Sequence, residues 1–101
     1  MLKIYLAELT DVEPAMLVGY AIFDLSNPLA TFVYELQVDK DVRRIGLGKS
    51  LLKGGEGCAL ELEVDVLNTA AIKFYTASGF KGPLWMPKAG TIKMRREAGS
   101  G

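Results

Sequence analysis

Two glycines, Gly46 and Gly48, stand among basic side chains in the segment RRIGLGKS, where a predicted strand gives way to a predicted helix. The first N–H groups of a helix are unpaired and carry partial positive charge, and glycine lets a ligand approach the backbone closely. Arg43, Arg44 and Lys49 add positive charge around them. We therefore predict a cradle for a pyrophosphate group. The alternative is an ordinary glycine turn with solvated basic residues, and the segment alone does not decide between the two.

The same segment lacks the fingerprints of two common nucleotide-binding folds. A P-loop requires a glycine five positions before the glycine that precedes its lysine, and Arg43 occupies that position. The dinucleotide fingerprint G-x-G-x-x-G fits Gly46 and Gly48 but meets Leu51 where its third glycine belongs. The predicted pyrophosphate must therefore belong to another kind of ligand.

Acid–base chemistry in this chain must use side chains other than histidine, because the sequence contains none. Glu35 lies within the apolar run FVYELQV, and we expect partial burial to raise its affinity for protons and make it a general base. A solvated surface glutamate is the alternative. In a regular strand Tyr34 points to the face opposite that of Glu35. A bulge would bring the side chains of Tyr34 and Glu35 to one cleft. Otherwise Tyr34 is an ordinary core aromatic residue.

A second helix with side chains suited to chemistry is predicted in NTAAIKFYTASGF. Asn68 is its predicted N-cap, and Gly79 marks its C-terminal end. Tyr75 lies on this helix beside Phe74, where it can pack as an ordinary helix aromatic residue. One helical face collects the residues Ala71, Phe74, Tyr75 and Ser78.

Around these residues the chain changes between strand and helix patterns. Strands are predicted at 2–9, 16–25 and 31–38, joined by short turns and therefore antiparallel. A short helix then follows the glycine segment and ends before residues 54 and 55. After it we predict a strand at 59–66, the second helix and one or two closing strands. The predicted fold class is α+β, with a mixed, mostly antiparallel sheet, a short helix at the pyrophosphate segment and one helix in the C-terminal half.

Two strands give specific predictions about burial. Apolar and acidic residues alternate at 59–66, so we expect the second helix to cover one face of this strand and water to meet the other. The expected buried residues are Leu60, Leu62, Val64 and Val66, and the expected solvated ones are Glu61, Glu63 and Asp65. The run MLVGYAIF has no polar alternation. We expect it to leave an apolar patch on the first two strands and a homodimer to form through them.

The composition limits the class of protein. The chain has 101 residues, 50% of them apolar, and its 12 basic residues balance its 12 acidic ones. We expect a single globular domain at 1–97, a flexible tail or linker at 98–101, and no direct binding of nucleic acid. With only Cys58 and no histidine, we expect neither a disulfide nor a zinc site. No segment has the pattern of a signal peptide or membrane span, so we expect an intracellular protein, cytoplasmic or also nuclear.

Three segments in order along the chain resemble the GNAT superfamily of N-acetyltransferases. Arg43-x-x-Gly46-x-Gly48 matches its pyrophosphate signature, the strand VYELQV precedes that signature, and NTAAIKFYTASGF is similar to its second cofactor motif. The resemblance covers Lys3 to about Phe80. Within the superfamily, VYELQVDKDVRRIGLGKSLL looks most like the branch that acetylates histone N-termini. Because the chain starts at what resembles the second strand, we expect it to be N-terminally truncated relative to the family.

The resemblance implies transfer of an acetyl group from acetyl-coenzyme A to an amine, without a metal. The acceptor it implies is a protein N-terminus, with a small amine or lysine as alternatives. A catalytically weak coenzyme A-binding or structural core is a further alternative. The resemblance makes Glu35 the general base, puts Tyr34 near the acceptor and has Tyr75 protonate the departing thiolate. The cofactor-binding residues it implies are Leu36, Val38, Arg43, Arg44, Ile45, Gly46, Leu47, Gly48, Lys49, Ser50, Asn68 and Tyr75.

Overall fold

The computed structural model describes residues 1–10, 13–40, 46–53, 58–83 and 90–99. Its elements follow in the order β1 (Leu2–Leu9), β2 (Met16–Asp24), β3 (Ala30–Val38), α1 (Leu47–Leu52), β4 (Ala59–Asp65), α2 (Thr69–Ala77) and β5 (Thr91–Arg96). The strands form one sheet in the order β1-β2-β3-β4-β5. Three of its four strand pairs are antiparallel, and the pair β3–β4 is parallel. This mixed sheet with two helices confirms the predicted fold class.

Local sequence chemistry accounts for several element boundaries. β2 ends at Asp24, whose carboxylate accepts the N–H of Ser26 at 2.9 Å and so forms a turn. α2 follows Asn68, whose Oδ1 accepts the N–H of Ala71 at 3.1 Å. Gly79 adopts a φ of 95° just after this helix, a conformation that favours glycine. The predicted N-cap and C-terminal glycine of the second helix are therefore confirmed.

α1 ends at Leu52 with Lys53 as its C-cap, so the predicted end of the first helix before residues 54 and 55 is confirmed, although those two residues lie outside the described part of the chain. Any additional closing strand within 84–89 also lies outside it. β5 supplies one closing strand and pairs antiparallel with β4. In the described residues, no helix has the length and apolar character needed to cross a membrane.

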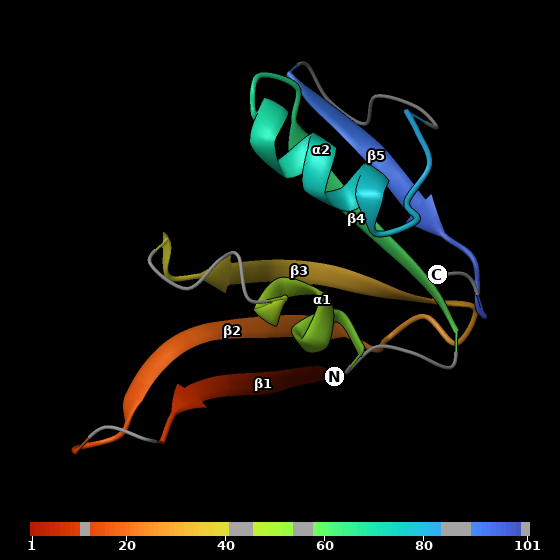
Figure 1. Ribbon diagram of the computed structural model, residues 1–101. Coiled ribbons are helices and arrows are strands. Elements are labelled where there is room, and N and C mark those ends of the chain that lie inside the picture. Colours follow the sequence, from red (N-terminus) through yellow and green to blue (C-terminus); the bar gives the residue numbers. More distant parts are fainter. Residues whose placement is uncertain (11–12, 41–45, 54–57, 84–89, 100–101) are drawn as a thin grey trace.

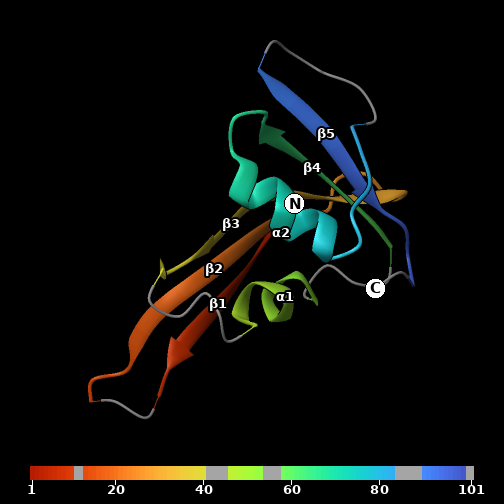
Figure 2. The ribbon, with the colours of Figure 1, turned by 45° about the horizontal axis from the view of Figure 1, so that its top comes forward.

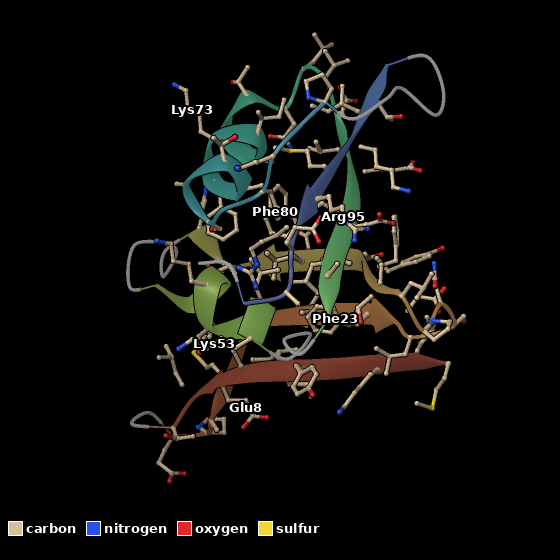
Figure 3. All side chains as sticks on the ribbon, turned by 90° about the vertical axis from the view of Figure 1, so that its right-hand side faces the viewer. Glu8, Phe23, Lys53, Lys73, Phe80 and Arg95 are labelled. Carbon is tan, nitrogen blue, oxygen red and sulfur yellow. The ribbon has the colours of Figure 1, made fainter. Side chains whose placement is uncertain are left out.

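Both helices cover the same face of the sheet, α1 over β2 and β3 and α2 over β4 and β5 (Figures 1 and 2). The hydrophobic core fills the space between them and the sheet. Phe23 from β2 and Phe80, which follows α2, are fully buried and point into this interior (Figure 3). Burial of a ring of this size stabilises the fold by about 1.5–3 kcal/mol. The buried core cluster comprises Ala21, Phe23, Val33, Leu51, Leu52, Leu60, Leu62, Val64, Phe80 and Met94.

The alternating strand β4 buries its apolar face as predicted, except at its C-terminal end. Leu60, Leu62 and Val64 are buried, whereas Val66 is exposed. β4 ends at Asp65, so Val66 lies in the turn that follows and no longer obeys the period of two. The prediction that Val66 is buried is therefore wrong.

The acidic face of β4 is less solvated than predicted. Glu63 and Asp65 are exposed, but Glu61 is half-buried because β5 places two cations against it. Arg95 Nη1 lies 2.6 Å and Lys93 Nζ 3.2 Å from its carboxylate oxygens, and Figure 3 shows Arg95 on β5 beside β4. Burial acts to raise the pKa of Glu61, but hydrogen bonds from Arg95 and Lys93 outweigh it, so this pKa lies below its ordinary value of 4.5.

The opposite face of β1, β2 and β3 is covered by neither described helix, and we call it the open face (Figure 2). Leu2, Ile4 and Leu6 of β1 are exposed there, and Met16 and Leu17 are exposed at the start of β2. The exposed apolar surface expected on the first two strands is therefore present.

We predict that Glu61→Gln lowers the free energy of unfolding by about 1 kcal/mol at pH 7, because the neutral amide pairs less strongly with Arg95 and Lys93. The folded-state pKa of Glu61 is depressed, so its stabilisation is complete above pH 4.5 and is lost as the pH falls through the folded-state pKa. The difference between variant and wild type should therefore disappear in acid. Urea denaturation at pH 7 and near pH 3 measures it.

The control for this prediction is Glu63→Gln, an exposed position two residues further along β4. It should change the unfolding free energy by less than about 0.5 kcal/mol at either pH. A loss for Glu61→Gln that persists unchanged in acid would contradict the ion-pair explanation.

Candidate functional site

The strands β3 and β4 form a fork. Their parallel pairing runs from Ala30 opposite Ala59 to Phe32 opposite Glu61. Beyond Phe32, β3 continues to Val38 while β4 runs on in a different direction, so the two strands diverge (Figure 1). α1 lies beside one arm of the fork and α2 beside the other. The fork therefore interrupts strand pairing in the middle of the sheet.

A β-bulge in β3 lies where the fork opens. Ile22 of β2 pairs with Glu35, and the next residue, Phe23, pairs with Val33, so Tyr34 is the extra residue. A bulge bends its strand and increases the local twist, which turns β3 away from β4. Tyr34 is 61% exposed. The interpretation of Tyr34 as a core aromatic residue is therefore wrong, and the bulge considered as the alternative is present.

A cavity of about 350 Å³ lies between the arm of β3, α1 and the first half of α2. This volume falls at the lower end of the range for small-molecule sites, about 300–1,000 Å³. Five predicted cofactor-binding residues meet at its walls, namely Leu36, Val38, Gly48, Asn68 and Tyr75. The other lining residues are Gln37, Ala70, Ala71 and Phe74, whose side chains have no predicted cofactor role.

One wall of the cavity is the arm of β3. Leu36 and Val38 pack against the core from the helix side of the strand. Glu35 and Gln37, which alternate with them, are exposed. Because the ladder with β4 has ended at Phe32, an extended ligand can lie along this arm in the position of an added strand.

The other wall is the first half of α2. Asn68 uses its Oδ1 to cap the helix, so its amide nitrogen remains as a donor on a side chain that lines the cavity. The Tyr75 ring contacts those of Phe74 and Phe80 edge-on, with centroids 5.3 and 5.4 Å away. Burial raises the pKa of Tyr75 above its ordinary value of 10.0. Its hydroxyl is therefore protonated at neutral pH.

Glycine occupies the two positions of the pyrophosphate segment for different structural reasons. Gly46 adopts a φ of 80° before α1, a left-handed conformation that favours glycine. Gly48 is buried inside α1, where a Cβ atom would lie 2.8 Å from Cζ of Phe74. The Phe74 ring therefore makes a close approach at Gly48, and the predicted approach of a ligand there stays a prediction. Lys49 and Ser50 are exposed on the same helix and do not line the cavity.

The rest of that segment is described only in part. Arg43, Arg44 and Ile45 lie outside the described residues. Leu47 is the first residue of α1, but its side chain also lies outside them. The pyrophosphate cradle thus stays a prediction, whereas the helix that it was expected to precede is present.

Glu35 stands on the open face of the sheet. It is exposed, so the expected partial burial is wrong, because neither described helix covers this face. The hydroxyl of Tyr20 donates a hydrogen bond of 2.7 Å to Oε2 of Glu35. This hydrogen bond, followed by partial burial and the charge of Glu35, raises the pKa of Tyr20. Sequence analysis missed Tyr20, since only the antiparallel register of β2 and β3 brings two residues 15 positions apart together.

The site therefore has two sides that meet at the fork. The cavity, which Tyr75 helps to line, lies on the helix side, and the carboxylate of Glu35 lies on the open face of the same strand, β3. Among the described residues, no group of three or more His, Cys, Asp or Glu side chains is placed to bind a metal ion.

The sequence matches the family profile of the acetyltransferase (GNAT) domain over residues 3–82. This chain belongs to the GNAT acetyltransferase family. The predicted family is therefore confirmed, over most of the chain. None of the curated proteins matched the sequence significantly.

Solved structures of GNAT proteins share the fold. A protein of Klebsiella pneumoniae, provisionally named an acyl-CoA N-acyltransferase, has a TM-score of 0.70 at 24% identity and matches 85% of this chain and 67% of its own. The NatC complex bound to Gag peptide and CoA has a TM-score of 0.71 at 21% identity over 93% of this chain and 70% of the other. The PaiA N-acetyltransferase of Thermoplasma acidophilum, solved with coenzyme A, has a TM-score of 0.67 at 20% identity over 82% and 57%. The GNAT chain described here thus spans 57–70% of the length of these three neighbours.

We predict that Gly48→Ala and Phe74→Ala are energetically coupled. In an otherwise wild-type chain, the new methyl group must displace the Phe74 ring. Without that ring, the same change should stabilise α1 by up to about 1 kcal/mol, as alanine normally does in a helix. A double-mutant cycle by urea denaturation should therefore give a coupling of about 1 kcal/mol or more.

Ser50→Ala is the matched control for this cycle, since Ser50 is exposed on the same helix. Its coupling to Phe74→Ala should stay below about 0.5 kcal/mol. Additive effects of Gly48→Ala and Phe74→Ala would show that the two residues do not share this contact.

Proposed function

We propose that this GNAT protein transfers the acetyl group of acetyl-coenzyme A to an amine, with a protein N-terminus as the acceptor. The observation that carries the proposal is the cavity in the fork of β3 and β4, where five predicted cofactor-binding residues meet. Its dimensions and walls suit an extended chain that carries amide groups, as the pantetheine arm of coenzyme A does. Membership of the GNAT acetyltransferase family independently supports the same cosubstrate.

The residues present fit such an arm. The arm of β3 around Leu36 supplies backbone groups beyond the end of the β4 ladder, and Asn68 supplies an amide donor across the cavity. Beyond the cavity, α1 and the basic segment before it would hold the pyrophosphate, with Gly46 turning the backbone toward it. Neighbours solved with CoA support this placement, including the NatC complex and PaiA.

In the proposed reaction, the open face supplies the general base and the cavity supplies the proton donor. Glu35 accepts the proton of the acceptor amine, directly or through a water molecule, so that the nitrogen lone pair can attack the thioester carbonyl. The new C–N bond forms as the C–S bond breaks. Tyr75 donates its hydroxyl proton to the departing sulfur, and solvent returns a proton to the phenolate. Tyr20 holds the Glu35 carboxylate in place through its 2.7 Å hydrogen bond.

The acceptor would bind on the open face. Tyr34 is exposed there next to Glu35, so an incoming amine meets an aromatic ring and a carboxylate at one point of the sheet. The NatC neighbour is bound to a Gag peptide, which supports a peptide N-terminus as the acceptor. The exposure of Glu35 favours the second candidate, a coenzyme A-binding core with weak catalysis, because a base open to water is poorly shielded.

We expect acetyl-coenzyme A to be turned over with N-terminal peptides, and Glu35→Gln to lower that rate about 100-fold near neutral pH. The loss should shrink at high pH, where more of the amine is already unprotonated. A panel of N-terminal peptides, lysine peptides and small amines, assayed for thiol release and acetylated product, measures both. Glu8→Gln, an exposed glutamate on β1, is the control and should keep full activity.

The same panel separates the two candidates. Acetylation of peptide N-termini supports the proposal, and preference for small amines would correct the acceptor. Coenzyme A binding by calorimetry without acetylation of any amine would establish the binding core instead.

We predict that Tyr75→Phe lowers kcat about tenfold or more while the affinity for acetyl-coenzyme A changes little, because the ring remains and only the proton donor is lost. Since burial raises the pKa of Tyr75 above 10.0, the defect should be constant between pH 7 and 9. Steady-state kinetics and calorimetry test both parts. Tyr5→Phe, which removes a hydroxyl from β1 at the far edge of the sheet, should have no effect. Weaker binding with unchanged kcat would assign Tyr75 to the cavity wall alone.

A further inference from the structure

β1 is an edge strand whose exposed side chains are apolar. It pairs with β2 on one side, and the described sheet ends there. Leu2, Ile4 and Leu6 stand opposite Asp24, Ile22 and Tyr20 on the open face, so all three project from the same side of the strand. They are 57%, 59% and 61% exposed. An edge with an apolar row of this kind is a template for the addition of another strand.

The stretch that can accept a partner is short and regular. Between Ala7 and Glu8 the register with β2 shifts by one residue, because Val18 is an extra residue in β2. Before that point β1 contains one charged side chain, Lys3, and it lies on the other side of the strand, with Nζ 5.2 Å from the centre of the Tyr5 ring. The apolar row is therefore free of charge between Leu2 and Leu6.

We propose that two copies of this chain associate through antiparallel pairing of their β1 strands, with the two-fold axis at Ile4. In this register Ile4 faces Ile4 of the second copy, and Leu2 faces its Leu6. The open-face row then becomes a ladder of six apolar side chains. On the other side of the strand, Lys3 faces Tyr5 of the second copy. These two residues make a cation–aromatic contact within one chain, and they can make the same contact across the interface.

The neighbouring registers of the strand pair are less stable, so the side chains of β1 favour a single alignment. Residues that share a face can meet only when the shift is two residues, because side chains alternate. A shift in one direction places Lys3 directly opposite Lys3 of the second copy, and like charges so placed are destabilising. A shift in the other direction places Glu8 opposite Leu2, which brings a carboxylate into the apolar ladder. The register centred on Ile4 avoids both.

The size of the contact sets the expected behaviour. One strand pair buries less than the roughly 1,200–2,000 Å² of a standard stable interface, so the dimer should form reversibly as concentration rises. β1 lies at the edge of the sheet, with β2 between it and the fork, so the dimer leaves the cavity accessible. The proposal is therefore independent of the proposed acetyl transfer.

Light scattering across the micromolar to millimolar range tests the association. The weight-average mass should rise from the 11.0 kDa of one chain toward twice that value. Ile4→Lys should weaken the association at least about tenfold, because it sets two ammonium groups against each other at the axis. Leu29→Lys makes the same chemical change at an 80% exposed position between β2 and β3 and should have no effect. A strict monomer at the highest concentration, or equal effects of the two variants, would overturn the proposal.

Cross-linking tests the register. In a Cys58→Ser background, Ile4→Cys places two thiols opposite each other across the pair, with Cα atoms about 4.5–5.5 Å apart, within disulfide range. It should form a covalent dimer under mild oxidation, as seen on a non-reducing gel. Leu6→Cys, equally exposed on the same face, should not, because its counterpart is Leu2 of the second copy. Failure of Ile4→Cys to cross-link, or equal cross-linking of both, would exclude the proposed axis. Circular dichroism confirms that each variant is folded.

Discussion

Beyond Phe32 the backbone of β3 turns away from β4, and the rest of the site depends on this separation. A parallel pair that continued to Val38 would bury its backbone groups in a ladder and leave no room for a ligand. The bulge at Tyr34 supplies the bend, since one extra residue in β3 changes its direction and twist. The cavity therefore exists because the sheet gives up strand pairing in its centre, where such pairing is normally most complete.

The core has to compensate for the interrupted sheet. α1 is short but buries Leu51 and Leu52 in the core, whereas α2 has no fully buried residue. The two helices approach each other through Gly48 and Phe74, and the missing side chain at Gly48 makes room for the ring. Tyr75 and Phe80 continue this aromatic packing toward β5. The same rings that close the core also form part of the cavity wall, which links the stability of the fold to the shape of the site.

The two faces of the sheet serve different purposes. The helix face holds the core and the cavity, whereas the open face carries Glu35, Tyr20, Tyr34 and the apolar row of β1. A carboxylate at this point can meet an acceptor directly from solvent, and its hydrogen bond to Tyr20 orients it without a covering helix. The apolar row at the far edge leaves a surface suited to a second copy. The uncovered face thus carries both the proposed acceptor site and the proposed contact with a second copy.

The sequence by itself determined the elements, because strand alternation, the Asn68 cap and the glycine segment are local signals that do not depend on distant neighbours. It also placed Leu36, Val38, Gly48, Asn68 and Tyr75 in one site, through their resemblance to family motifs. Only the tertiary structure decided which faces are covered. Glu35 is exposed although its strand is apolar, Glu61 is half-buried although its face is acidic, and Gly48 meets Phe74. Periodicity identifies the residues that share a face, but burial depends on what packs against that face, and that is set by contacts between residues far apart in the chain.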